Sequence, residues 1–175
     1  MFHELSFVNW KKIIIFVNIY LMFCIYKIKF TKSPFDLNED YDRLSDIDKE
    51  KIADMEADSF FDYEEDGVYT FFTIAEPIEV KRYLGVLSEN LIRFESTDLS
   101  KDVLKGKFDI NSEVGSKVDT IDSMKFSFFV DDLDEWIYNN LDIDTILDRI
   151  SQVGLDSLTK IEKEFLNNNY NVWKN

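Results

Sequence analysis

The chain has 175 residues, 45% apolar and 15% aromatic, so one packed domain with short appendages is expected. A single histidine (His3) and a single cysteine (Cys24) exclude Ser-His-Asp and Cys-His catalysis, disulfide frameworks and multi-cysteine zinc sites. Residues 1–35 carry five lysines and one acidic side chain, which leaves a net charge of −19 on residues 36–175. A body this acidic repels phosphate backbones, so nucleic acid is not an expected partner.

The N-terminal part contains an apolar stretch over residues 13–26 with lysines on both sides. Counted over residues 7–30, with the lysine stems lying along the apolar region, it approaches the length of a membrane span. We therefore predict a hydrophobic N-terminal helix over residues 1–30. Three interpretations stay open: a membrane anchor, a signal peptide, or translated DNA upstream of the true start. The flanking lysines are Lys11, Lys12, Lys27 and Lys29.

The side of the membrane follows from the same lysines. Those after the apolar stretch (Lys27, Lys29 and Lys32) slightly outnumber those before it (Lys11 and Lys12), which places the acidic body on the cytoplasmic side of a bacterial inner membrane. Without an anchor, the protein is expected to be cytoplasmic. The membrane is therefore an expected partner only through residues 7–30.

The middle of the chain begins with an acidic linker over residues 31–58, in which Ser45 starts a short capped helix. Residues 68–74 are rich in β-branched and aromatic side chains and predict a strand. A helix is predicted after Pro77, from apolar side chains at helical spacing through Leu87. Alternation of apolar and polar residues then predicts a second strand over residues 92–96.

Two further elements complete the predicted α+β domain over residues 59–140. Residues 124–130 have the composition of a strand, and a helix is predicted to open at Asp131. The order of these elements indicates a small antiparallel sheet with helices on one face.

Four carboxylates at the start of this last helix are the strongest candidates for acid–base or magnesium chemistry. A helix N-terminus favours acidic side chains without any such role, and we take this simpler explanation. No catalytic, cofactor-binding or metal-binding residue is therefore predicted. The four residues are Asp131, Asp132, Asp134 and Glu135.

Residues 141–175 predict a C-terminal helical hairpin. Apolar side chains recur at helical spacing from Ile143, and Gly154 is expected to end this helix in the left-handed conformation of a Schellman motif. Thr159 and Glu162 have the spacing of a capping box, which starts a second helix.

The apolar stripe of the hairpin is too large to remain in water. It docks either on the α+β body, which makes it structural, or on another protein, which makes it the functional surface. Trp136 has the spacing of a core residue and would be an anchor if it were exposed. The candidate interaction surface comprises Ile143, Ile146, Leu147, Ile150, Leu158, Ile161, Phe165 and Trp136.

Two resemblances add to this prediction. The sequence I-D-x-I-L-D-R-I-S-x-x-G-x-x-S-L-T-x-x-E-K-x-F-L over residues 143–166 resembles the C-terminal tail module of bacterial rhomboid-like membrane proteins, which recurs on other chains. It implies no protease activity, because the chain lacks a G-x-S-x-G motif. The motifs F-T-I-x-x-P-I-E-V at residues 72–80 and F-F-V-x-x-x-D at residues 128–134 make residues 68–138 similar to a small ferredoxin-like family of signal-transducing domains.

These observations lead to a functional expectation. We expect a bacterial, non-enzymatic interaction or regulatory module without a cofactor, whose partner is another protein and which is tethered to the membrane. The alternative is an acidic inhibitor of a basic partner, such as an immunity protein or a nucleic-acid mimic, indicated by the net charge of −19 on residues 36–175.

Overall fold

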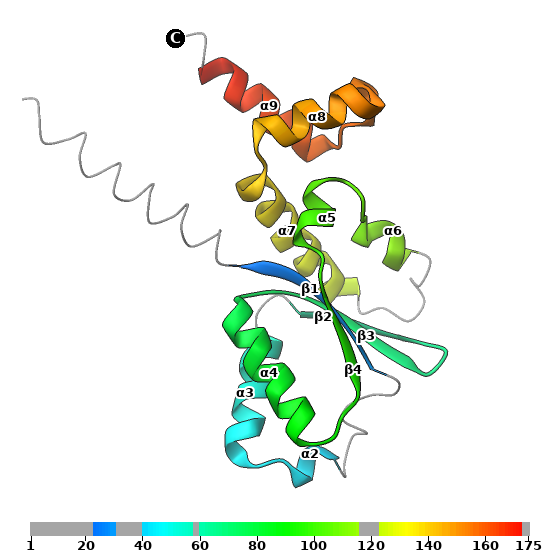
Figure 1. Ribbon diagram of the computed structural model, residues 1–175, viewed down its shortest axis with the longest axis vertical. Helices are drawn as coiled ribbons and strands as arrows, with labels where there is room; N and C mark the ends of the chain where they lie inside the picture. The colour runs from blue at the N-terminus through cyan, green and yellow to red at the C-terminus, as the bar shows by residue number, and fades with distance from the viewer. Residues whose placement is uncertain (1–22, 31–39, 58–59, 116–122, 173–175) are drawn as a thin grey trace, which may run out of the picture. The chain divides into compact units, whose positions relative to one another are not determined.

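The computed structural model describes residues 23–30, 40–57, 60–115 and 123–172. Over these residues the protein is α+β, with four strands and eight helices (Figure 1). The chain divides into two compact units after Leu133. The first holds Cys24–Leu133, and the second holds Phe23 and the residues from Asp134 onward.

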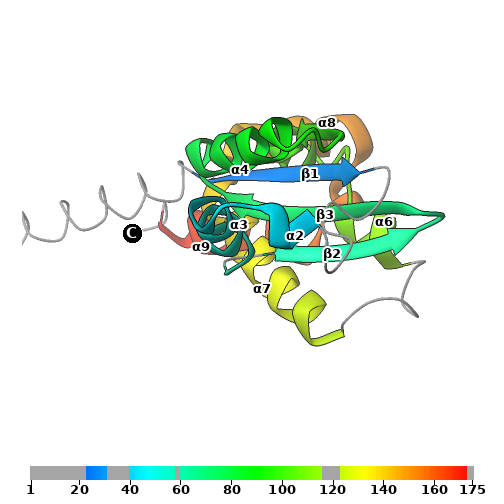
Figure 2. The ribbon, with the colours of Figure 1, turned by 90° about the horizontal axis from the view of Figure 1, so that it is seen from below.

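Four antiparallel strands form one sheet in the order β2-β3-β1-β4. Figure 2 shows β1, β3 and β2 side by side. Asp66 and Gly67, with φ of 52° and 72°, make the two-residue turn between β2 and β3, and positive φ at both positions is the requirement of the hairpin turn that Asp-Gly favours. The strands are β1 (Cys24–Phe30), β2 (Phe60–Glu65), β3 (Val68–Ala75) and β4 (Phe94–Asp98).

Two helices connect these strands in a recognisable topology. Helix α3 (Asp46–Ala57), preceded by the short α2 (Asp40–Arg43), lies between β1 and β2, and α4 (Pro77–Glu89) lies between β3 and β4. The resulting order is β-α-β-β-α-β, with β1 and β3 at the centre of the sheet, which is a split β-α-β arrangement.

Helices α3 and α4 cover one face of this sheet (Figure 1). Alternate residues of the two central strands point toward them, and Phe71 meets Tyr83 of α4 edge-on at 5.6 Å between ring centroids. Ile28, Phe71 and Leu87 are fully buried in this layer. The main core comprises Ile28, Phe30, Leu44, Ile52, Met55, Phe71, Ala75, Val80, Tyr83, Val86 and Leu87.

The opposite face of the sheet is covered as well. Phe72 follows Phe71 in β3 and therefore points the other way, where its ring lies 6.4 Å from Phe108 and 6.4 Å from Phe129. Phe129 belongs to α7 (Ser123–Asn140), and Phe108 lies between the short helices α5 (Ser100–Leu104) and α6 (Ile110–Gly115). The prediction of helices on one face is therefore wrong, because the segment expected to add a strand adds a helix instead.

Several predicted elements are confirmed and others need correction. The helices expected after Ser45 and Pro77 and the strand over residues 68–74 are present, and the strand expected at residues 92–96 lies two residues later, as β4. Residues 124–130 are helical, so α7 begins at Ser123 and not at Asp131. Their aromatic and β-branched side chains fit a helix because the buried and half-buried ones recur every three or four residues.

The largest correction concerns the hydrophobic N-terminal helix. Its last seven residues, Cys24–Phe30, are strand β1 at the centre of the sheet. The apolar residues Ile28 and Phe30 face α3 and α4, while Lys27 and Lys29 point to the other face. Two of the expected membrane-flanking lysines, Lys27 and Lys29, are thus sheet residues. The rest of the predicted segment, residues 1–22, lies outside the described residues.

Candidate functional site

The C-terminal hairpin is built from two capped helices, α8 (Ile143–Val153) and α9 (Lys160–Val172). The Asp142 carboxylate caps α8 by accepting the Thr145 backbone N–H at 2.8 Å and its hydroxyl at 2.6 Å. These hydrogen bonds hold the pKa of Asp142 below its ordinary value. The predicted capping box of α9 is confirmed: Thr159 N–H donates to Glu162 Oε2 at 2.7 Å, and Glu162 N–H donates to Thr159 Oγ1 at 3.2 Å.

Gly154 ends α8 as predicted but in a different geometry. Its φ is +88°, which favours glycine, and its N–H donates to Ile150 O at 2.9 Å. Its ψ of 163° lies far from the left-handed helical region of a Schellman motif. The chain therefore leaves α8 extended and enters a 3-10 turn, η2 (Leu155–Ser157), before α9.

A buried ion pair joins the two helices of the hairpin. Arg149 Nη1 of α8 lies 2.5 Å from Glu162 Oε1 of α9, and the Glu162 side chain is only 4% exposed. Arg149 Nη2 also donates to Ser157 O at 3.4 Å, in the connecting turn. Glu162 thus uses one oxygen for Arg149 and the other for the capping box. In the sequence, only the capping box singles out Glu162, and the capping box does not indicate that Arg149 of α8 is its partner.

The tail also packs against the end of α7. Tyr138 meets Phe165 of α9 edge-on at 5.6 Å between ring centroids, and Asn168 Nδ2 donates to Tyr138 Oη at 2.9 Å. Trp136 is buried, as its spacing predicted, and its indole N–H donates to Phe23 O at 3.0 Å. Part of the apolar stripe is therefore covered by this chain itself.

The predicted surface residues divide by burial. Ile146 and Leu158 are buried with Trp136, while Ile143, Ile150, Ile161 and Phe165 are half-buried. Leu147 is exposed. Two further apolar residues of the tail that the predicted surface did not include, Val153 and Leu155, are also exposed.

These exposed residues lie on α8 and in the turn that follows it. Residues 147, 150 and 153 are three apart and therefore lie along one ridge of the helix. The exposed fractions of Leu147, Val153 and Leu155 are 52%, 63% and 60%. We call these three residues the tail patch. The exposed side chains around it include Asp144, Asp148 and Asp156.

Lys27 lies in the sheet unit, in an environment that its sequence context did not predict. Its side chain is 11% exposed and forms an ion pair with Glu113 of α6. The Lys27 ammonium lies 5.4 Å from the ring centroids of both Phe72 and Phe108, within the range of cation–π attraction. Through these contacts, Lys27 of β1 links α6 and the segment before it to the sheet.

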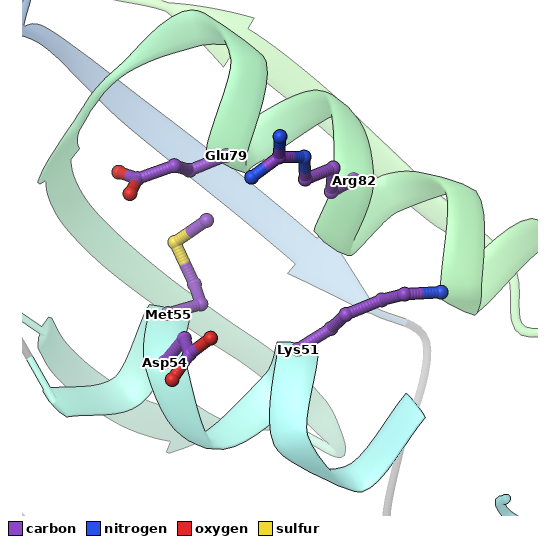
Figure 3. Close-up of a pocket in the computed structure, with 5 residues that line it drawn as sticks. All are labelled: Lys51, Asp54, Met55, Glu79 and Arg82. Carbon is purple, nitrogen blue, oxygen red and sulfur yellow. The ribbon is translucent and has the colours of Figure 1, made fainter. Parts of the chain in front are cut away.

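A cleft of about 70 Å³ lies between α3 and α4. Figure 3 shows Lys51 and Asp54 on the α3 side and Glu79 and Arg82 on the α4 side, with Met55 between them. Sites for small organic ligands usually occupy about 300–1,000 Å³ and are mostly apolar, so this cleft has room for a few waters or one small charged group. Its two bases and two acids balance, so it selects neither charge.

The four carboxylates predicted at a helix start lie in the interior of α7, so the macrodipole explanation is wrong for them. Asp131, Asp132, Asp134 and Glu135 are all exposed. In the described part of the chain, no group of three or more His, Cys, Asp or Glu side chains is placed to hold a metal ion.

Comparison with known proteins gives no match: no family model, curated protein or solved structure matches this chain. Among the helices of the described ranges, none is both long and apolar enough to cross a membrane.

Proposed function

We propose that this protein is a non-enzymatic interaction or regulatory module that binds another protein through the C-terminal hairpin. The observation that carries the proposal is the tail patch: three large apolar side chains, each more than half exposed, on a hairpin whose geometry is fixed by a buried ion pair. A surface held rigid before binding loses little conformational entropy when the partner docks.

The tail patch is large enough to matter for affinity. Fully burying a Leu or Val side chain contributes about 1.5–3 kcal/mol. Because more than half of each of the three side chains remains exposed, covering them would contribute about 3 kcal/mol in total, or roughly a 100-fold gain in affinity. The neighbouring acidic side chains favour a partner whose apolar groove has a basic rim.

The proposal is tested with a variant that removes the tail patch. The partner is identified by cross-linking to the full chain, purified, and titrated against the wild type and the triple variant Leu147→Ser, Val153→Ser, Leu155→Ser. We expect the triple variant to bind about 100-fold more weakly. Ile47→Ser on α3, where the isoleucine is 66% exposed, is the matched control and should bind as the wild type does. Equal affinity of the triple variant and the wild type would overturn the proposal.

The two sequence resemblances also support this proposal, but less strongly than the tail patch does. The likeness of residues 143–166 to the rhomboid-type tail module favours a tail that functions as a transferable unit. The likeness of residues 68–138 to the family of signal-transducing domains favours a regulatory role. Transfer of residues 134–175 to an unrelated carrier protein, followed by titration with the same partner, separates binding by the tail from binding by the rest of the chain.

A second candidate function is inhibition of a basic partner. The observation that favours it is the exposed carboxylate series on α7, Asp131, Asp132, Asp134 and Glu135, on a chain with a net charge of −15. Such binding is electrostatic and must weaken as salt rises from about 50 to about 500 mM. An affinity independent of salt, or insensitive to the change of these four residues to Asn and Gln, would exclude it.

Membrane attachment on the cytoplasmic side is a proposal that now depends on residues 1–22, because β1 occupies Cys24–Phe30. Its support is the sequence Lys11-Lys12 followed by apolar residues. Co-sedimentation with vesicles of equal parts phosphatidylcholine and phosphatidylglycerol compares the full chain with a chain that begins at Met22. Equal recovery of both chains in the vesicle pellet would exclude attachment through this segment.

A further inference from the structure

Strand β4 lies at one edge of the sheet, and among the described residues no strand pairs with its outer side. In the part of the chain that the structure describes, it pairs with β1 alone. The side chains from Glu95 to Asp98 are all exposed, although they alternate between the two faces of the sheet. The register with β1 runs without interruption from Phe94 to Asp98, so no bulge turns this edge away from a further strand.

The backbone groups that face outward can be assigned from one hydrogen bond. Leu99 N–H donates to Ile25 O at 2.8 Å, and these two residues continue the β1–β4 register. Hydrogen-bonded and non-hydrogen-bonded pairs alternate in an antiparallel ladder. Glu95 and Thr97 therefore direct their N–H and C=O groups toward β1. The outward-facing groups belong to Phe94, Ser96 and Asp98.

Charge discriminates between the strands that could pair there. The edge strands β2 and β4 carry acidic side chains and no basic ones, the central β1 carries two lysines, and β3 carries no charge. Two copies of β4 can pair antiparallel only in a register that sets outward-facing residues opposite one another, such as Ser96 opposite Ser96, and in that register no basic side chain lies opposite Glu95 or Asp98. A second copy of this chain therefore supplies no charge complementary to these carboxylates, whereas a basic strand does.

We propose that the open edge of β4 binds an extended, lysine- or arginine-containing segment of a partner protein, which adds a fifth strand to the sheet. The outward N–H and C=O groups of Phe94, Ser96 and Asp98 supply the main-chain hydrogen bonds. Glu95 supplies the charge selection: in the described residues its carboxylate takes part in no hydrogen bond or ion pair, whereas Asp98 already accepts from Ser100 N–H at 2.9 Å. This site lies in the sheet unit and is independent of the tail patch.

The test uses the full chain and a blocked synthetic peptide of alternating lysine and valine, titrated by NMR. We expect the amide signals of Phe94, Ser96 and Asp98 to shift on binding and the affinity to fall with salt. Ser96→Pro removes an outward N–H without touching the β1 ladder, a position where an edge strand accepts proline, and should weaken binding about tenfold or more. Ser96→Ala keeps the N–H and should bind as the wild type does. Glu95→Gln should bind more weakly and with less salt dependence.

Two results would overturn the proposal: equal affinity of Ser96→Pro and the wild type, or peptide-induced shifts confined to residues outside β4. A peptide of alternating glutamate and valine must not bind. If Ser96→Pro fails to fold, hydrogen exchange of the wild type decides the question, because the outward amides of Phe94, Ser96 and Asp98 must become protected when the lysine peptide is added.

Discussion

The ion pair between Arg149 and Glu162 allows a quantitative test of the tail. Replacement of Glu162 by Ala leaves a guanidinium that is only 20% exposed without its 2.5 Å partner, and it removes the acceptor of the Thr159 N–H. Breaking a buried pair by removing one partner costs about 3–5 kcal/mol, and losing a helix cap costs about 1 kcal/mol. Since Arg149 retains some solvent contact, we expect Glu162→Ala to destabilise the hairpin by about 3–4 kcal/mol.

Matched variants separate the charge from the cap and from simple truncation. Glu162→Gln can still accept the Thr159 N–H but loses the charge, so it should cost about 1–2 kcal/mol. The double variant Arg149→Met, Glu162→Met removes both charges and should cost less than Glu162→Ala. Glu164→Ala, at an exposed position on α9, should change stability by less than about 0.5 kcal/mol.

The measurement is amide hydrogen exchange of α8 and α9 in the full chain, supported by urea unfolding. A local loss of 3–4 kcal/mol accelerates exchange of the protected hairpin amides by about two to three orders of magnitude, up to the limit set by local opening. If Glu162→Ala exchanged no faster than Glu164→Ala, the pair would contribute nothing in solution, and the rigid presentation of the tail patch would lose its physical basis.

Three further outcomes are expected. Ile28→Ala, at a fully buried position of β1, should lower the free energy of unfolding by about 2–5 kcal/mol in urea, whereas Lys29→Ala should change it little; equal effects would contradict a central β1. Asp142 has a lowered pKa, so its carboxylate stabilises α8 above about pH 4 and this contribution of about 1 kcal/mol disappears as the pH falls through the folded pKa. Asp142→Asn, which caps without titrating, should abolish that acid dependence in thermal unfolding, and an unchanged dependence would refute the assignment. Burial, with smaller contributions from Cys24 and Asp98, raises the pKa of Tyr26 to about 12, so ultraviolet titration should show a tyrosine signal near pH 12 and the stability should fall between about pH 10 and pH 12; Tyr26→Phe should remove both effects.

The sequence predicted those elements whose local signals agree with their tertiary environment. Helix α4 has proline at its first position and buried side chains at helical spacing, and α9 has a capping box, so both could be read from neighbours along the chain. Strand β1 could not be read in this way. Its residues continue an apolar stretch, and the alternation from Tyr26 to Phe30 becomes meaningful only when α3 and α4 cover one face.

The start of helix α7 was predicted wrongly because its local composition conflicts with its tertiary environment. Aromatic and β-branched composition over residues 124–130 favours a strand locally, but Phe129, Leu133 and Trp136 are buried at spacings of four and three residues across the predicted boundary. The prediction of the candidate interaction surface on the tail was limited in a similar way. The pattern identifies an apolar stripe, but whether Ile146 or Leu147 meets solvent depends on helices that pack from elsewhere in the chain.

The place of β1 in the sheet has a consequence for how the protein is made. The first strand of the described residues is a central one, and both its neighbours come much later: Cys24 pairs with Ala75 and Tyr26 with Asp98, about 50 and about 70 residues downstream. During synthesis, β1 must wait with an unpaired backbone and an apolar face until β3 and β4 have left the ribosome. Contacts this distant along the chain slow folding, and such a strand can pair wrongly in the interval. The order of synthesis therefore makes β1 the segment for which chaperone protection would matter most.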